Sequence, residues 1–244
     1  KNGDVLMLEN VRFNAEENLK LKPEEASKTH LVQKLSQMGD IFVNDAFGTS
    51  HRSQPTMVGL PMVMRSVAGL LMEKEVTTLS RVFENAPGPV CMVLGGTKVD
   101  DSLSVAKHVL PNRVADLVIV TGVVANIFLR AAGFRIGRGS DQIIQQLGYE
   151  KEVERARLLL DSYRDRIMYP GSVAVKEGGR RVEYPADSIP GDAMIIDAGM
   201  DAISCLAERI RSSRTVVFNG PAGVFEDPDY ATGTHELLRA ASKE

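Results

Sequence analysis

Cysteine, histidine and tryptophan are scarce in this 244-residue chain, which has two cysteines, four histidines and no tryptophan. Cys91 lies in an apolar run and Cys205 at helical spacing among apolar residues, so we predict two core side chains rather than a disulfide or a metal pair. Unpaired cysteines fit a reducing compartment such as the cytoplasm. No clustered His/Cys set and no Ser/His/Asp arrangement is visible, so we expect neither a protein-held metal nor covalent catalysis.

Long apolar runs and patches of one charge sign are also missing. No stretch of 18 apolar residues exists and no signal peptide opens the sequence, so we expect no membrane partner. Lys and Arg number 29 against 32 Asp and Glu, giving a net charge of −3. Because these charges are spread evenly, nucleic acid is not expected as a partner. The 43% hydrophobic and 25% charged content is typical of a globular protein with one large or two small domains.

The first third of the chain predicts a small α/β unit. Residues 4–9 have the pattern of a strand, and residues 41–43 have the pattern of a second strand. Between them, Pro23 and two acidic residues begin a helix. Its expected buried face carries Leu31, Leu35 and Met38. Two strands separated by a helix are expected to be parallel. A long helix over residues 66–85, capped by Ser66, then ends at Pro87-Gly88-Pro89.

The remainder predicts a larger α/β domain. Its expected strands are residues 90–94, 117–121, 194–197 and 215–218. Helices are expected at residues 101–110, 125–132, from 140, from 150, 202–211 and 234–244. Residues 173–183 differ, since Gly178-Gly179 between two short apolar runs indicates a β-hairpin. We therefore expect three parts: residues 1–65, a connecting helix at 66–86, and a larger α/β domain at 87–244.

A glycine pair follows the expected strand 90–94. Gly95 and Gly96 allow a close approach of backbone to a bound group, the next helix offers free N–H groups, and Lys98 adds a full positive charge. These features suit a phosphate, although Gly-Gly at this position also serves merely to turn the chain. The spacing matches neither G-x-x-x-x-G-K-[ST] nor G-x-G-x-x-G.

A second glycine-containing loop follows the expected strand 215–218. It contains Asn219, Gly220, Pro221 and Glu226. Ligands of open parallel sheets bind beyond the carboxyl ends of the strands, where both loops are expected. Together they indicate either a nucleotide site or two unrelated turns. Glu226 could accept hydrogen bonds from ribose hydroxyls, although a lone glutamate is more often a solvated surface charge.

Arginine follows both expected strands of the first unit. Arg12 comes after residues 4–9, and Arg52, with His51 beside it, comes after residues 41–43. Arginine binds phosphate or carboxylate through two parallel hydrogen bonds. An anion site at one sheet edge is one interpretation, and ordinary surface charge is the other.

Four segments resemble phosphoglycerate kinases. They are Leu8-Glu9-Asn10-Val11-Arg12-Phe13, Val43-Asn44-Asp45-Ala46-Phe47-Gly48-Thr49-Ser50-His51-Arg52, Leu94-Gly95-Gly96-Thr97-Lys98-Val99 and Asn219-Gly220-Pro221-Ala222-Gly223-Val224-Phe225-Glu226. The Asn-Asp-Ala-Phe and Asn-Gly-Pro-x-Gly-Val-Phe-Glu strings are specific to that family. Asp100-Asp101-Ser102 and His51-Arg52-Ser53-Gln54-Pro55 are most similar to its archaeal branch.

This resemblance implies two Rossmann-like α/β domains joined by a long helix, the first incomplete here. It implies reversible phosphoryl transfer between 1,3-bisphosphoglycerate and MgADP, giving 3-phosphoglycerate and MgATP, with Mg²⁺ bound through the nucleotide. Arg12, Arg52 and His51 would bind phosphoglycerate, and Lys98 and Arg12 would be catalytic. The nucleotide would be bound by Gly95, Gly96, Lys98, Gly122, Asn219, Gly220, Pro221 and Glu226. We expect a monomer, with a dimer as the alternative.

Three departures from the family pattern matter. The family's opening Asp-x-Asn-x-Pro loop is not found before Lys1, nor its closing Gly-Gly-Gly-Asp-Thr loop after Glu244, so we expect an internal piece of a longer protein that is inactive alone. Ser102 stands where many members have a second lysine. The alternatives are another ATP-dependent kinase of a small carboxylate and a non-catalytic nucleotide-binding module.

Overall fold

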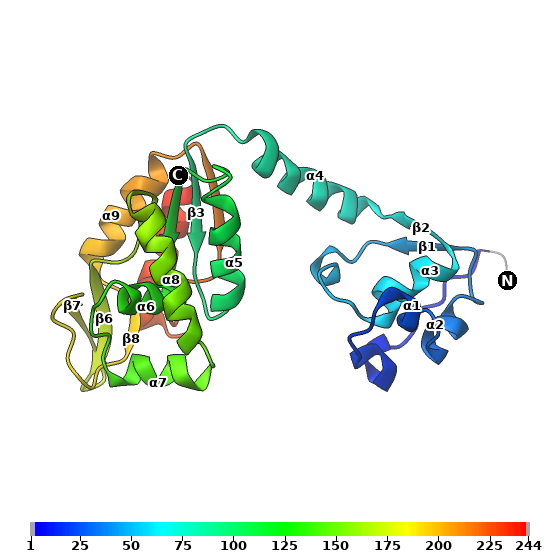
Figure 1. Cartoon of the computed structure of the whole chain (residues 1–244), viewed down its shortest axis with the longest axis horizontal. Coiled ribbons are helices and arrows are strands. Elements are labelled where there is room, and N and C mark those ends of the chain that lie inside the picture. The colour runs from blue at the N-terminus through cyan, green and yellow to red at the C-terminus, as the bar shows by residue number, and fades with distance from the viewer. Residues whose placement is uncertain (1–2, 243–244) are drawn as a thin grey trace. The chain divides into compact units, whose positions relative to one another are not determined.

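The computed structural model describes residues 3–242 and divides the chain into two compact units, residues 1–81 and 82–244. The division falls within helix α4 (Leu70–Asn85), so residues of one continuous helix belong to both units (Figure 1). Both units are mixed α/β with parallel strands, as the sequence predicted.

The main sheet of the second unit has four parallel strands in the order β5-β4-β3-β9. These strands are β5 (Ile167–Met168), β4 (Leu117–Val120), β3 (Val90–Leu94) and β9 (Thr215–Asn219). Every residue of β3 is buried. Helices cover both faces, so the central strands β3 and β4 are apolar along their whole length, and this is why the sequence revealed them. The edge strand β9 is half-buried, and its apolar residues 216–218 also allowed its prediction. The two-residue β5 was not predicted.

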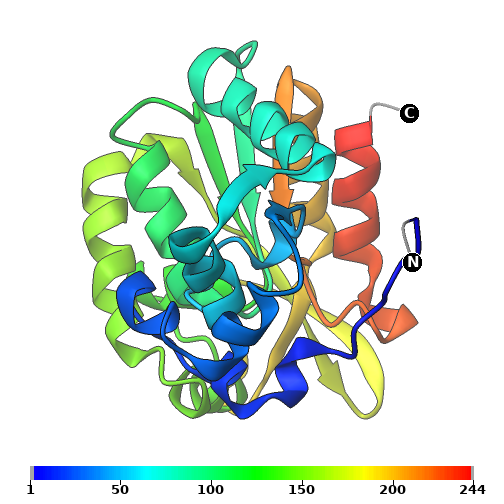
Figure 2. The ribbon, with the colours of Figure 1, turned by 90° about the vertical axis from the view of Figure 1, so that its right-hand side faces the viewer.

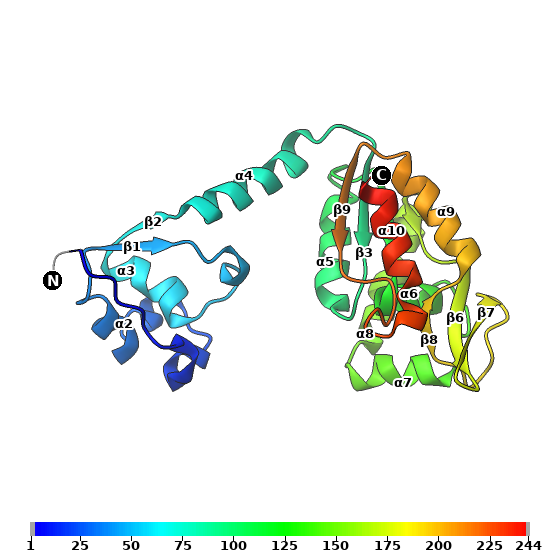
Figure 3. The same ribbon diagram turned by 180° about the vertical axis from the view of Figure 1, so that it is seen from behind.

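Helices form a layer on each face of this sheet. On one face lie α5 (Val99–Val109), α6 (Gly122–Ala131) and α8 (Glu150–Tyr163), which share a core with Met92 and Leu94. On the other face lie α9 (Met200–Arg211) and α10 (Thr232–Ser242), which share a core with Cys91 and Val93. Figure 3 shows α9 and α10 packed side by side. The alternation of β3 side chains between the two cores follows from the two-residue period of a strand.

A second sheet has three antiparallel strands in the order β7-β6-β8. The hairpin of β6 (Ser172–Glu177) and β7 (Arg180–Pro185) turns at Gly178 and Gly179, as predicted (Figure 2). Both glycines have positive φ, 53° and 79°. A two-residue hairpin turn of type I′ requires positive φ at both central residues. Strand β8 (Ile195–Ala198) was expected in the parallel sheet, and that was wrong, since it pairs antiparallel with β6. An apolar run indicates a buried strand but not its direction.

The first unit contains one pair of parallel strands and several short helices. Its strands are β1 (Ile41–Asn44) and β2 (Arg65–Ala68). Its helices are α1 (Pro23–Ala26), α2 (His30–Leu35), α3 (Leu60–Val63), the π-helix η4 (Pro55–Gly59) and the 3₁₀ helices η1 (Val11–Phe13), η2 (Ala15–Asn18) and η3 (Phe47–Thr49). The second unit adds α7 (Arg138–Gln146), η5 (Arg164–Arg166) and η6 (Pro228–Tyr230).

Two predictions for the first unit were wrong. Residues 4–9 are extended but form no strand ladder, and Val5 is 95% exposed, because a strand needs a pairing partner that a local pattern cannot supply. The partner of β1 is instead β2, where the sequence predicted the beginning of a helix. The helix begins only at Leu70, after Gly69 donates its N–H to the Asn44 carbonyl oxygen and Asp45 Oδ1 accepts from Met72 N.

The predicted helix from Pro23 is broken into α1 and α2. Thr29 caps α2 by accepting a hydrogen bond from Val32 N at 3.4 Å. Val32 is the buried side chain of α2, whereas Leu31 and Leu35 are half-buried and Met38 is exposed. The new cap rotates the helix start and therefore changes which positions face inward.

Cys91 is buried, and burial raises the pKa of its thiol to about 11 although a hydrogen bond with Ser213 partly lowers it. Cys205 is exposed, so the prediction of a core side chain was wrong there. On α9 the core face is formed by Ile203, Leu206 and Ile210, and a residue between them in sequence falls on the outer face.

Helix α10 begins two residues before its predicted start at Thr234, and residues 243–244 of the predicted helix lie outside the described residues. Within residues 3–242, no helix combines the length and the apolar character that a bilayer crossing requires.

Candidate functional site

Three loops meet at the carboxyl edge of the main sheet. They follow β3, β4 and β9, and short backbone hydrogen bonds join them. Gly96 N donates to Pro221 O at 2.8 Å, Val123 N donates to Gly96 O at 3.1 Å, and Gly122 N donates to Ala222 O at 2.9 Å. Because all three strands are parallel, their loops leave the sheet on the same side. The structure thus brings together the two glycine-containing loops identified in the sequence and adds the loop at Gly122.

Glycine is required at Gly95 and Gly220 by loop packing. A Cβ on Gly95 would lie 2.5 Å from the Pro221 carbonyl oxygen, and a Cβ on Gly220 would lie 2.4 Å from the Gly95 carbonyl oxygen. Gly220 also has φ of +83°. Glycine is therefore needed at these two positions because the backbones of the two loops contact each other closely. This agrees with the simpler interpretation that Gly95 and Gly96 serve to turn the chain.

Gly96 and Gly122 have a different surrounding, because both line a cavity. Gly122 has φ of +58°, and a Cβ there would lie 2.8 Å from Gly96 N. Gly122 also opens α6, and its cap residue Thr121 makes no side-chain cap hydrogen bond. The N–H groups of Gly122 and Val123 donate to Ala222 O and Gly96 O, so it is the positive end of the α6 dipole, rather than these donors, that favours an anion beside the cavity.

Lys98 is the N-cap residue of α5. Its side chain is exposed and has no hydrogen-bond or ion-pair partner within residues 3–242. Ser102, four residues further along the helix, is 1% exposed. A side chain at that position faces the protein core, so the residue that replaces the family's second lysine does not project from the surface beside Lys98.

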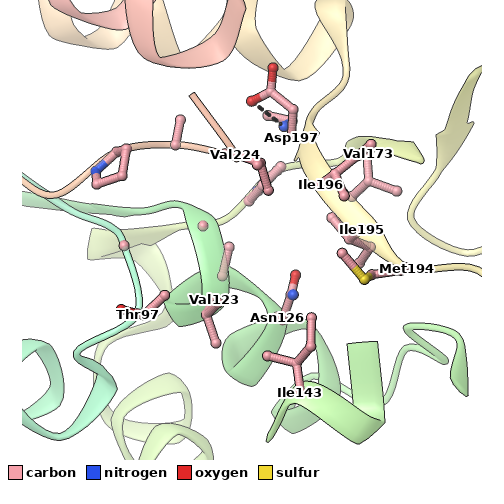
Figure 4. A pocket seen from close by; sticks show the side chains of 18 of the residues that line it. Thr97, Val123, Asn126, Ile143, Val173, Met194, Ile195, Ile196, Asp197 and Val224 are labelled. Atoms are coloured by element: carbon pink, nitrogen blue, oxygen red, sulfur yellow. Dashed lines mark hydrogen bonds between the residues drawn. The ribbon is translucent and has the colours of Figure 1, made fainter. Parts of the chain in front are cut away.

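The cavity has a volume of about 310 Å³ and lies entirely within the second unit (Figure 4). Its polar lining side chains are Thr97, Asn126, Asp197 and Glu226. The rest is mainly backbone of the glycine loops and apolar side chains, including Val123, Ile143, Val173, Met194, Ile195, Ile196 and Val224. An apolar cavity with a few polar groups and glycine backbone at one side is typical of a small-molecule site.

Of the predicted nucleotide residues, Gly96, Gly122, Pro221 and Glu226 line the cavity. Gly95, Lys98, Asn219 and Gly220 do not, although Gly95 and Gly220 shape the loops that do. Glu226 is exposed, and its side chain has no partner among the described residues. The structure thus brings the predicted residues to one place, while the role of each remains a prediction.

Two cavity residues were missed by sequence reasoning, Asn126 and Asp197. Asp197 lies on β8, and its carboxylate accepts hydrogen bonds from Arg181 Nη1 at 2.8 Å, Gly233 N at 2.9 Å and Ala198 N at 2.9 Å. Burial raises the pKa of Asp197 above its ordinary value, and the Gly233 N–H and the Arg181 guanidinium offset part of that shift. One side chain therefore links the cavity wall, the hairpin and the start of α10. An aspartate inside a strand gives no sequence signal for such a role.

The predicted anion residues of the first unit are Arg12, Arg52 and His51. Arg12 lies in η1 and Arg52 follows η3, and neither side chain has a partner among the described residues. Arg12 does not follow a strand, so the argument from two strand ends at one edge was wrong. His51 is exposed.

Buried Glu17 connects the segments that carry these arginines. It is 2% exposed, its carboxylate accepts from Thr56 N at 3.0 Å and from the Thr56 hydroxyl, and its carbonyl oxygen accepts from Gln54 Nε2 at 2.9 Å. Asn18 Nδ2 also donates to the Arg12 carbonyl oxygen at 3.2 Å. The two segments are therefore held to each other by side chains rather than by the sheet.

No group of three or more His, Cys, Asp or Glu side chains within residues 3–242 is arranged to hold a metal ion.

A parallel sheet with glycine loops around a cavity at its carboxyl edge is an arrangement that many nucleotide-binding α/β proteins share. Comparison with known sequences identifies the family to which the chain belongs. The profile of the family described as Phosphoglycerate kinase matches residues 1–244, and the chain belongs to this family.

Individual relatives agree with the family profile. A phosphoglycerate kinase of Methanocorpusculum labreanum is 58% identical over 98% of this chain and 59% of its own length. The crystal structure of the Pyrococcus horikoshii OT3 phosphoglycerate kinase superposes with a TM-score of 0.88 at 41% identity, over 95% of this chain and 58% of that one. The structure of the Coxiella burnetii phosphoglycerate kinase superposes with a TM-score of 0.70 at 31% sequence identity, over 96% of this chain and 58% of that one. Curated relatives are mostly archaeal, as predicted. The chain spans about three fifths of the relatives it matches.

Proposed function

We propose that the protein to which this chain belongs carries out, at its natural length, the reaction of the family, reversible phosphoryl transfer between 1,3-bisphosphoglycerate and MgADP. The observation that carries the proposal is the glycine-loop cavity, which is lined by Thr97 before α5 and by Gly122 at the start of α6. The cavity, the free Lys98 and the family membership support one function together, whereas each alone is compatible with other nucleotide-dependent enzymes.

The cavity residues fit a nucleotide. The positive end of the α6 dipole beside Gly96 and Gly122 would favour phosphates, and the exposed Glu226 carboxylate would accept hydrogen bonds from ribose. Gly95, Gly220, Asn219 and Pro221 would act mainly by shaping the loops. Bound Mg²⁺ would neutralise charge on the phosphates during transfer.

The first unit would bind the phosphoglycerate. Arg12 and Arg52 carry guanidinium groups with no partner among the described residues, and a guanidinium is suited to bidentate binding of phosphate or carboxylate. His51 would supply a further donor. The proposed reaction needs both units, because the two substrates would bind to different ones.

Phosphoryl transfer needs little covalent chemistry from the protein. It needs aligned reactants and positive charge around the spread negative charge of the transition state. Lys98 supplies one such charge, and Arg12 a second on the phosphoglycerate side. Since Ser102 is buried, no cation projects from the position four residues after Lys98. Lys98 therefore acts with less help from α5 than in relatives that have lysine there.

The test is a steady-state assay of the protein expressed at its natural length. MgATP is supplied with 3-phosphoglycerate or with glycerate, acetate or another small carboxylate in turn, and ADP formation is measured. We expect turnover with 3-phosphoglycerate at least a hundredfold above every other acid. Equal turnover with another acid would instead indicate a different small-carboxylate kinase, and MgADP binding without any turnover would indicate a nucleotide-binding module.

We further propose that the protein acts in the cytoplasm, because its proposed nucleotide substrates are found there. A fusion to a fluorescent protein that localised elsewhere would contradict this.

A further inference from the structure

The side chain of Asn126 is an unpaired amide in the wall of the cavity. Asn126 lies on α6 and is 2% exposed. Its Oδ1 is fully buried without a hydrogen-bond partner, and within the described residues its Nδ2 has none either. More than nine in ten buried polar groups in proteins are hydrogen-bonded. An amide with neither atom paired therefore indicates a partner that the protein itself does not provide.

The surroundings of this amide are apolar. Ile143, Met194 and Ile195 line the same cavity, and Figure 4 shows the Asn126 amide pointing away from Ile143, on the side where Ile195 and Met194 are labelled. An unpaired amide in such surroundings is costly, so a ligand that pairs with it gains more than it would at a solvated site. Apolar side chains around one polar group suit the face and edge of an aromatic ring.

Position along α6 separates this group from the phosphate side of the cavity. Gly122 opens the helix, and Asn126 follows four residues later, which is one turn or about 6 Å further along the axis. If phosphates lie at the helix start, a group one turn deeper meets the opposite end of the nucleotide. An asparagine amide both donates and accepts, which matches the mixed donors and acceptors on the edge of a purine base.

We propose that Asn126 is the residue that recognises the nucleotide base, through hydrogen bonds from its amide to the edge of a purine. This rests on the proposed nucleotide site, but it adds a residue and a role. Base preference is then set by Asn126 in α6, while Glu226 and the glycine loops bind the ribose and phosphates common to all nucleotides.

The test compares Asn126→Leu with the wild type for two ligands, MgADP and the magnesium complex of ribose 5′-diphosphate, which lacks the base. Calorimetry of the protein at its natural length gives Kd for each. We expect Asn126→Leu to weaken MgADP about tenfold or more and to change ribose 5′-diphosphate less than twofold. Gln146→Leu is the matched control, since Gln146 is an exposed amide at the end of α7 outside the cavity.

Three results would overturn the inference. MgADP affinity unchanged in Asn126→Leu would show that an internal water or no partner satisfies the amide, and an equal loss for both ligands would show a structural role. In the wild type, side-chain amide NMR resonances of Asn126 should shift with MgADP but not with ribose 5′-diphosphate, so equal shifts would contradict it without any variant. A wild type that binds neither ligand would instead refute the nucleotide site itself.

Discussion

Replacing Asp197 by alanine tests how the cavity wall is held. The substitution removes the acceptor for Arg181 Nη1, Gly233 N and Ala198 N, all at 2.8 to 2.9 Å. The Asp197 side chain is fully buried, whereas the Arg181 side chain is 17% exposed. Breaking a buried ion pair by removing one partner costs about 3–5 kcal/mol.

The lower end of that range applies to Asp197→Ala. Arg181 keeps hydrogen bonds to Glu183 Oε1 at 3.1 Å and to the Ala198 carbonyl oxygen at 2.6 Å, so its charge is not left alone. We expect a loss of about 3 kcal/mol in the free energy of unfolding of residues 82–244. With a slope of about 2 kcal/mol per molar urea, the midpoint falls by about 1.5 M.

Tyrosine fluorescence during urea unfolding measures this loss in the right part of the chain. All five tyrosines lie between Tyr149 and Tyr230, and tryptophan is absent, so the signal reports only the second unit of the 244-residue chain. Glu208→Ala, at an exposed position on α9, is the control and should change stability by less than about 0.5 kcal/mol. A loss below about 1 kcal/mol in Asp197→Ala would refute the reasoning.

The pH dependence of the same unfolding gives an independent check. Because burial raises the pKa of Asp197 in the folded state, the folded protein holds this proton more tightly than the unfolded chain does. The contribution of Asp197 to stability therefore falls as pH rises from its ordinary pKa through its raised pKa, and is constant above. Asp197→Ala should lack that slope, and an unchanged slope in the variant would contradict the assignment.

Three further predictions concern the proposed substrates and the first unit. Arg52→Ala should weaken 3-phosphoglycerate binding at least tenfold by calorimetry, since a charged hydrogen bond is lost; unchanged affinity would remove Arg52 from the site. Lys98→Ala should lower kcat by about 10²–10³ with a smaller change in KM, as loss of a transition-state charge predicts; an unaltered kcat would reject that role. Glu17→Ala should cost about 1–3 kcal/mol by leaving Thr56 N unpaired, and hydrogen exchange at the Thr56 amide should accelerate, whereas equal exchange would show that Glu17 does not hold this segment.

The fold of the second unit could be predicted well because its central strands are buried on both faces. A continuous apolar run such as Val90–Leu94 leaves few alternatives. The direction of β8 could not be predicted, because pairing with β6 depends on contacts between segments rather than on the local pattern. The same limit explains the error at residues 4–9, where an apolar run without a partner strand stays exposed.

The site could be predicted where it depends on loops and not where it depends on helices and strands. Gly96 follows a strand, and the rule that ligands bind beyond the carboxyl ends of a parallel sheet directed attention to the loop that lines the cavity, whereas Gly122 was named only from the family resemblance. Asn126 and Asp197 lie inside regular elements, where a polar residue in sequence is ordinarily read as a surface position. Their burial against a cavity becomes visible only once the elements are packed.

The central claim is that a nucleotide binds in the glycine-loop cavity of the second unit. A crystal structure of the natural-length protein with MgADP tests it most directly. We predict density for the diphosphate beside the loops at Gly96 and Gly122 and for the base between Asn126 and Val224. Nucleotide density outside this cavity, or none at saturating MgADP, would contradict the account.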